Sequence, residues 1–415
     1  MAALALVLVG LLLLTDTGGF LSTDVGGKLA TLEAMDRRGD LSPDLGYWAE
    51  DLDPDGSLYP MFSTAHVDDK WVNVTTLPML YTALPLYRLG GAHLAGLVPL
   101  LGTVLAALGA RTLARRLGGD GTLAFWVVGL ASPATIYALD FWEHSVALAL
   151  MVWAVVLVLD AVRVDTGGWQ RAAVAGLLFG LAATMRQEAF VYGFVAGAAL
   201  GVRLLLSGRP LTAVARGSAM LTGTALAIIG NTLLEDRALG SSARNSRSTG
   251  TAAAVGEDLS VRLEEAMTTF AGPMAVVTMF DVLVAILLVG LLVELGRRAL
   301  DGRTVRPIVV GLAWISALVL VDLLSGGLRF VPGLAATTPV AVIGLSALRR
   351  RGDVGFVGAI AVVSLPLVWA VQYTGGAGPQ WGGRYILLTG TLLVVATTVV
   401  FTGPAARAVV RRVAV

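Results

Sequence analysis

Solitary ionisable residues stand in the short turns between long apolar stretches of this sequence. They are Asp140, Glu143, His144, Arg186, Glu188, Asp322, Arg329 and Arg384, with Tyr385 beside the last. A charged side chain in hydrocarbon costs about 2.5–3.5 kcal/mol even on the gentlest scales, so such groups face a polar cavity, a partner or the membrane interface. We expect them to line one cavity, with Asp281 as a further candidate.

Glycine pairs precede two of these arginines, Arg329 and Arg384. Glycine lets a backbone or a ligand approach closely, and the planar guanidinium group matches the oxygens of a phosphate. The pattern predicts a phosphate-binding site formed by Arg384, Arg329, Arg186 and His144. In the alternative interpretation, each arginine extends to the interface or forms a local pair, such as Arg186 with Glu188.

The segment after the first apolar stretch predicts a short amphipathic helix on the membrane surface. Apolar residues from Val25 to Met35 recur at intervals of three and four, and Gly39 supplies a C-terminal stop. Asp24 stands just ahead of this helix. It has two interpretations: an N-cap or dipole partner of the helix, or a carboxylate available for chemistry.

A second group of polar residues, His66, Asp68 and Asp69, lies further along the same segment. Its oxygen and nitrogen atoms are ligands that a divalent cation accepts. A solvated loop has the same composition, so these residues are weak metal candidates. We expect no required cofactor, and a divalent cation is not favoured.

The composition identifies the class of protein. Of 415 residues, 56% are hydrophobic and only 14% are charged, whereas soluble domains carry about 25% charged residues. The chain is therefore expected to lie in a membrane. The absence of cysteine excludes disulfide scaffolds, thiolate metal sites and cysteine nucleophiles.

Apolar runs closed by charge or by glycine and proline predict an all-α polytopic protein of about twelve membrane-spanning helices. These begin near residues 1, 93, 122, 145, 171, 188, 212, 273, 307, 330, 354 and 385. Arginines crowd every second turn, which predicts cytoplasmic turns and two cytoplasmic termini. The first apolar run, Met1 to Leu14, is short for a span, and a signal peptide is its alternative interpretation.

Residues 1–415 then form a single transmembrane domain with two long extracytoplasmic loops. The first loop covers residues 16–92 and carries the amphipathic helix, and the second covers residues 232–272. In the second loop we expect a flexible basic stretch followed by a helix that begins near Glu257. Asymmetric loops of this kind favour a site at the outer surface.

Short motifs follow one another along most of the chain in a definite order. They are Ser22-Thr23-Asp24, Leu130 to Tyr137, Trp142-Glu143-His144, Gly180 to Glu188, Gly230-Asn231 and Gly383-Arg384-Tyr385. In this order they resemble the polytopic GT-C glycosyltransferases, the family that includes the protein O-mannosyltransferases and the lipid A aminoarabinose transferase. The resemblance implies transfer of a sugar from a polyprenyl-phosphate-linked donor to a glycan, lipid or protein acceptor on the extracytoplasmic side.

The chemistry that this resemblance implies needs few groups. Displacing a lipid phosphate from an anomeric carbon requires a base for the acceptor hydroxyl, but little acid help, because phosphate is a good leaving group. Asp24 is then the expected base. Arg384 and Arg329, with Arg186 or His144, would stabilise the charge that grows on the departing phosphate. Direct displacement would invert the anomeric centre.

One departure from the family concerns the residue after the expected base. Many members place a second acidic residue there, and this chain has Val25, which disfavours a metal-dependent version. Two other functions stay open: a transporter or flippase for lipid-linked glycans, and an O-antigen ligase or polymerase that would not need Asp24. We expect membrane lipids as neighbours, no nucleic acid, and a place in the plasma membrane of a prokaryote.

Overall fold

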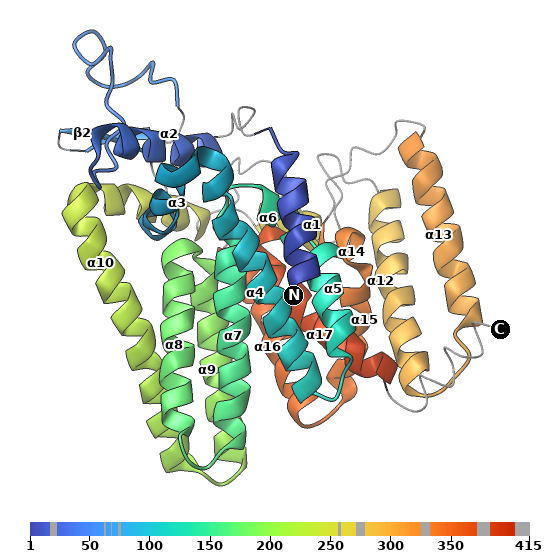
Figure 1. The fold of residues 1–415 in the computed structure, drawn as a ribbon. Coiled ribbons are helices and arrows are strands. Elements are labelled where there is room, and N and C mark those ends of the chain that lie inside the picture. The colour runs from blue at the N-terminus through green and yellow to red at the C-terminus, as the bar shows by residue number, and fades with distance from the viewer. Residues whose placement is uncertain are drawn as a thin grey trace.

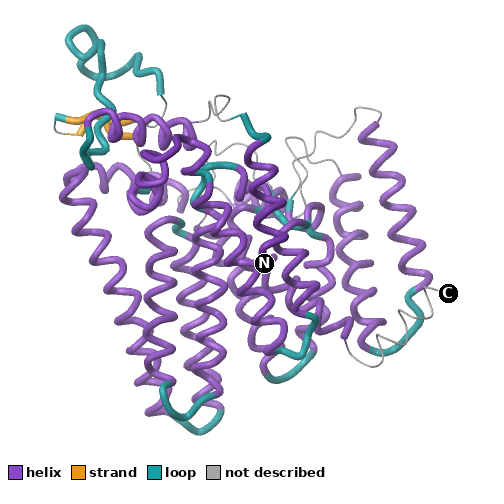
Figure 2. The backbone as a smooth tube through the Cα atoms, in the orientation of Figure 1, coloured by secondary structure: helices purple, strands orange, loops and turns teal. Residues whose placement is uncertain are grey.

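The computed structural model describes residues 1–16, 23–61, 64–67, 69–73, 76–255, 259–270, 279–324, 333–371 and 382–402. This part of the chain is mostly helical (Figures 1 and 2). Its elements are α1 (Ala2–Leu13), α2 (Thr23–Arg38), β1 (Thr64–Val67), β2 (Lys70–Asn73), α3 (Leu77–Ala95), α4 (Leu97–Arg116), α5 (Gly121–Leu130), α6 (Ala134–Leu139), α7 (His144–Arg163), α8 (Gly168–Met185), α9 (Glu188–Leu206), α10 (Pro210–Val255), α11 (Leu259–Phe270), α12 (Met279–Leu300), α13 (Arg306–Leu324), α14 (Leu334–Thr337), α15 (Pro339–Ile343), the 3-10 helix η2 (Gly344–Arg349), α16 (Asp353–Val371), the 3-10 helix η3 (Arg384–Ile386) and α17 (Leu387–Thr402).

Six helical stretches in the described part are long and apolar enough to cross a membrane. They are Leu97–Arg116, His144–Arg163, Glu188–Leu206, Pro210–Leu239, Asp353–Val371 and Arg384–Thr402. The other predicted spans coincide with α1, α5, α8, α12, α13 and the stretch from α14 to η2. Of these, Ala2–Leu13, Gly121–Leu130, Arg306–Ala317 and Pro339–Arg349 are shorter apolar helices within the described residues. The helical, membrane-compatible class is confirmed, and the number of about twelve spans stays a prediction.

Small residues set how closely the helices of the bundle approach. A Cβ atom added at Gly176 of α8 would collide with the carbonyl of Met220 in α10, and one at Gly223 of α10 would collide with the carbonyl of Ala173. Gly102 of α4 lies in the same way against the start of α7. Close backbone approach of this kind increases van der Waals contact between helices in a membrane, where the hydrophobic effect contributes little.

A separate layer of short elements covers one end of the bundle (Figure 1). It contains α2, α3 and the antiparallel pair β1–β2, in which His66 stands opposite Trp71. The amphipathic helix expected from Val25 to Met35 is confirmed as α2, and the stop at Gly39 is confirmed by its left-handed backbone, φ +70°. The hairpin lies beside α2, and sequence periodicity did not predict it (Figure 2).

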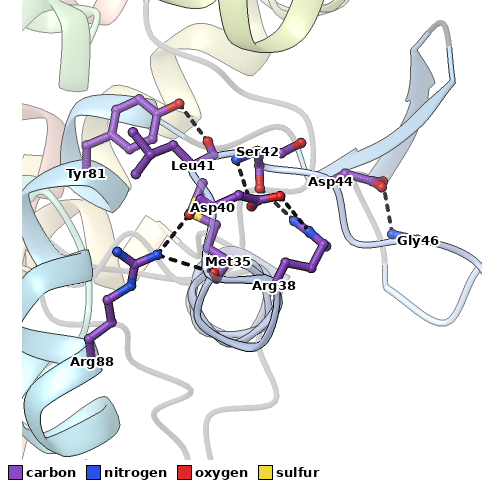
Figure 3. A network of polar contacts seen from close by, with 9 residues as sticks. All are labelled: Met35, Arg38, Asp40, Leu41, Ser42, Asp44, Gly46, Tyr81 and Arg88. Carbon is purple, nitrogen blue, oxygen red and sulfur yellow. Dashed lines mark hydrogen bonds and ion pairs between the residues drawn. The ribbon is translucent and has the colours of Figure 1, made fainter.

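Polar contacts join α3 to the end of α2 (Figure 3). Arg88 of α3 donates to the carbonyls of Met35, at 3.4 Å, and Asp40, at 3.0 Å. The Tyr81 hydroxyl, also from α3, donates to the carbonyl of Leu41 at 3.0 Å. These bonds satisfy the Met35 carbonyl in the last turn of α2 and two carbonyls just after the helix, and they connect α3 to this end of α2.

Basic turns lie at the opposite end of the bundle from α2 (Figure 1). Their arginines form partly exposed ion pairs there, including Arg163 with Asp353 at 2.6 Å and Arg116 with Asp160 at 2.8 Å. The arginine-rich turns that the sequence groups together therefore lie at one end of the described bundle. That the basic end faces the cytoplasm stays a prediction.

The second outer stretch differs from our expectation. We expected residues after Asp236 to form a flexible basic loop, but α10 continues without interruption to Val255. The helix expected from Glu257 is found as α11, beginning at Leu259. The glycines and serines in this stretch lower helix propensity only modestly, so a long preceding helix can extend through them.

Candidate functional site

A chain of buried ion pairs joins three parts of the fold at the outer end of the bundle. Lys28 of α2 places Nζ 2.6 Å from Oε2 of Glu143, which directly precedes α7. The other oxygen of Glu143 lies 3.4 Å from Nη1 of Arg186, in the turn between α8 and α9. Arg186 Nε in turn lies 3.0 Å from Oε1 of Glu188, the first residue of α9. This geometry fixes all four side chains relative to one another.

A second arginine joins this chain through aromatic rings. The guanidinium carbon of Arg384 lies 5.1 Å from the centre of the Trp142 ring and 4.9 Å from that of Tyr385. Arg186 lies 5.2 Å from the same Tyr385 ring. Cation–π attraction is worth about 0.5–2 kcal/mol at such distances. Tyr385 therefore holds two like-charged groups in one small volume.

Two glycines shape the turn that delivers Arg384. Gly382 has φ +63° and Gly383 has φ +70°, a left-handed conformation that other residues rarely adopt. Their hydrogens also face crowded neighbours: a Cβ at Gly382 would collide with the ring of Pro133, and one at Gly383 would lie 2.6 Å from the carbonyl oxygen of Thr269. The glycine pair noted in the sequence is thus required by backbone conformation and by space.

Lys28 is the residue that the sequence prediction missed. It lies on the apolar face of α2, three residues after Val25 and four before Leu32, and all three are buried. Lys28 itself is 2% exposed. A charged residue on an apolar helical stripe is the signal that could have identified it, because such a position faces the core and requires a partner.

Three rings surround the middle of the site. His144, the first residue of α7, stacks on Tyr137 with ring centres 4.6 Å apart and planes at 13°. The Trp142 ring lies 4.8 Å from the His144 ring. Lys28 Nζ lies 5.4 Å from the Trp142 ring centre, so Trp142 contacts cations of both α2 and η3. Among the described atoms, neither ring nitrogen of His144 has a hydrogen-bond partner.

The electrostatics favour an ionised Glu143. Burial alone would raise the pKa of this carboxyl, but Lys28 and Arg186 outweigh burial and lower its pKa to about 2. The described cluster then holds the cations Lys28, Arg186 and Arg384 together with the carboxylates Glu143 and Glu188, and Asp140 lies in the adjoining turn. Guanidinium and ammonium groups gathered in this way can bind an anion through charge-assisted hydrogen bonds.

Most of the predicted site residues are gathered here. The residues that the structure brings together are Glu143, His144, Arg186, Glu188, Arg384 and Tyr385. Asp140 lies in the same turn, where its carbonyl accepts the Trp142 backbone N–H at 2.6 Å. Three of the four expected turns therefore lie close together in the structure. The participation of the turn with Asp322 and Arg329, the shared cavity and the functional roles stay predictions.

Four other predicted residues are not placed. Arg329 lies outside the described residues. Asp24, which we expected just ahead of the helix, is the second residue of α2, because α2 begins at Thr23. Asp281 and Asp322 lie on the backbones of α12 and α13, and the side chains of all three aspartates are outside the described part. The roles expected of them therefore remain predictions.

The weak metal candidates lie elsewhere, in the outer layer. His66 Nε2 is 3.3 Å from Oε1 of Glu50, and the His66 ring stacks on Trp71 with centres 4.5 Å apart. Asp68 is outside the described residues, and Asp69 lies in the turn between β1 and β2. Within the described ranges, no group of three or more His, Cys, Asp or Glu side chains could hold a metal ion.

Comparison with known proteins did not assign the chain to a family. No family model matches the chain, and the searches of curated proteins and of solved structures found no match.

Proposed function

We propose that this chain is a polytopic membrane glycosyltransferase of the GT-C kind, with about twelve spans. It transfers a sugar from a polyprenyl-phosphate-linked donor to an acceptor on the extracytoplasmic side, with inversion at the anomeric carbon. The basic turns would face the cytoplasm of a prokaryotic cell. The acceptor would be a glycan, a lipid or a protein.

One observation carries this proposal. Lys28, Arg186 and Arg384 meet in a buried cluster at the end of the bundle opposite the basic turns. These residues come from segments far apart in the chain, and Arg384 is only 6% exposed. Snorkelling arginines extend towards water, whereas these side chains are enclosed. A buried group of cations at a membrane surface supports binding of a lipid phosphate.

The proposed reaction uses the outer helix α2 and the cluster together. Asp24 precedes Lys28 by four residues in α2, which is one helical turn or about 6 Å of rise. Asp24 removes the proton of the acceptor hydroxyl, the hydroxyl oxygen bonds to the anomeric carbon, and the bond from that carbon to the phosphate oxygen breaks. The phosphate leaves with the bonding electrons, and Arg186 and Arg384 stabilise its added charge.

The deciding experiment is transfer in isolated membranes. Membranes that contain the protein should move labelled sugar from a member of a panel of polyprenyl-phosphate-linked hexoses and pentoses to the envelope fraction. Asp24→Asn should abolish transfer without loss of expression. Arg384→Gln should lower the rate by about a hundredfold, because one preorganised electrostatic contact contributes about 3 kcal/mol to the barrier.

A carboxylate on the same helix supplies a matched control. Asp36 of α2 is partly exposed and lies 3.8 Å from Arg88, so Asp36→Asn should retain transfer. Full activity of Asp24→Asn would remove Asp24 from the mechanism. Transfer only from diphosphate-linked glycans would favour a ligase or polymerase, and movement of intact lipid-linked sugar across the bilayer would favour a flippase.

A further inference from the structure

Trp142 and His144 form a neutral corner of the cationic cluster. Trp142 stands in the turn between α6 and α7, and His144 is the next residue but one. His144 is only 2% exposed, between the rings of Tyr137 and Trp142. Their ring contacts with Tyr137, Lys28 and Arg384 fix where the polar edges of both residues lie.

Those polar edges lack partners. Among the described residues, the indole N–H of Trp142 and both ring nitrogens of His144 are buried without a hydrogen bond. An unsatisfied buried polar group costs about 1–3 kcal/mol. Neighbouring hydroxyls are satisfied: Ser145 donates to the carbonyl of Pro99 at 2.8 Å, and Thr103 donates to that of Ala134 at 2.8 Å. At this place in the fold, the Trp142 indole and the His144 imidazole therefore lack the partners that the neighbouring hydroxyls have.

The types of the unsatisfied atoms indicate which group would complete them. Burial favours the neutral imidazole, which offers one donor and one acceptor, and indole offers a donor only. A phosphate diester accepts hydrogen bonds but donates none, so it could not use the accepting nitrogen of His144. A hydroxyl group both donates and accepts, and it satisfies this nitrogen and the indole N–H together.

Trp142 and His144 lie beside the cations that would bind the phosphate, so a hydroxyl bound to these two residues would be close to that phosphate. Lys28 and Arg384 lie 5.4 Å and 5.1 Å from the Trp142 ring centre. A phosphate held by these cations therefore has the corner as its immediate neighbour. The group covalently attached to such a phosphate would lie against Trp142 and His144.

We propose that Trp142 and His144 bind a hydroxyl of the sugar that is joined to the phosphate, so that the site distinguishes a sugar-bearing lipid phosphate from a bare one. This inference rests on the proposed function, because it assigns the sugar part of the same donor. Trp142 binds through its indole N–H, and its ring also positions Arg384. His144 supplies the accepting nitrogen.

The test measures binding, without a transfer step. The ligands are a short-chain polyprenyl phosphate and a panel of its hexose and pentose esters, titrated against the full-length protein in lipid nanodiscs. At least one ester should bind about tenfold more tightly than the bare phosphate. Trp142→Phe keeps the ring but removes the N–H, and it should weaken binding of that ester by about 5–10-fold, in line with one lost hydrogen bond.

The bare phosphate serves as the control ligand in the same variants. Its affinity should change less than twofold in Trp142→Phe, which retains a ring beside Arg384. Arg384→Gln should instead weaken both ligands. Equal loss of both ligands in Trp142→Phe, or no loss of either, would overturn the inference and leave the proposed function standing. No ester binding better than the bare phosphate would also overturn it, and failure of the wild type to bind any of these ligands would refute the proposed function itself.

Discussion

Replacing Glu143 by glutamine should destabilise the whole fold, because Glu143 is the partner of two buried cations. Lys28 and Glu143 side chains are 3% and 7% exposed, and their charged atoms are 2.6 Å apart. Removing one member of a buried pair typically costs about 3–5 kcal/mol, because the other charge stays buried and unpaired. The pKa of Glu143, lowered from 4.5 to about 2, corresponds to about 3 kcal/mol by linkage, in the same range.

The assay is thermal unfolding of the purified protein in detergent. If the chain unfolds as one unit, 3–5 kcal/mol corresponds to a melting temperature lower by about 3–6 °C. The control is Glu50→Gln, whose partner is His66; these side chains are 48% and 35% exposed, and a surface pair of this kind contributes about 0–1 kcal/mol. A loss in Glu143→Gln no larger than that of the control would refute the reasoning.

Two further measurements separate charge from shape. The double variant Lys28→Met with Glu143→Gln should be more stable than Glu143→Gln alone, because no unpaired ammonium remains. The pH dependence has a definite sign. A lowered carboxyl pKa stabilises the fold above about 4.5, and this stabilisation is lost as pH falls towards about 2, so wild type and Glu143→Gln should converge in that window.

Two glycines give further tests. Gly102→Ala should lower stability by about 1–3 kcal/mol, measured as a lower melting temperature, because its Cβ would lie 2.7 Å from the backbone nitrogen of Val146. The control Gly10→Ala should leave the melting temperature unchanged, because its Cβ would meet no atom within 4 Å among the described residues. Equal effects of the two substitutions would contradict the close packing at Gly102. Gly383→Ala should weaken polyprenyl phosphate binding by about tenfold, because the positive φ of Gly383 and the nearby Thr269 carbonyl both oppose a side chain there. Unchanged binding would show that this turn does not set the position of Arg384.

The sequence predicted those parts of the site that local rules control. Turn residues between apolar helices must lie near one end of a bundle or the other, which is why the sequence alone groups Glu143, Arg186 and Arg384. Helical periodicity predicted α2, and the glycine at position 39 predicted its end. Each of these predictions rests on a local pattern, the composition of one turn or the periodicity of one helix, even where the turns lie far apart in the chain.

Contacts between distant segments were not predictable in the same way. Lys28 and Glu143 are far apart in the chain, and nothing local specifies that α2 docks where α7 begins. The hairpin β1–β2 was missed because each strand has only four residues, too few for an alternating pattern to be distinctive. The helical character of residues 240–255 was missed because composition suggested a loop, whereas α10 continues through them.

The ion pair between α2 and the bundle has a consequence for how substrates would reach the site. Lifting α2 away would break the buried pair of Lys28 with Glu143 and leave Arg186 as the ion-pair partner of Glu143 among the described residues. The ion pair thus opposes displacement of α2, so substrates would have to enter the site by a route that does not require α2 to move. A donor carried in the bilayer would arrive sideways, between helices, while a water-borne acceptor would approach around the rim of the outer layer.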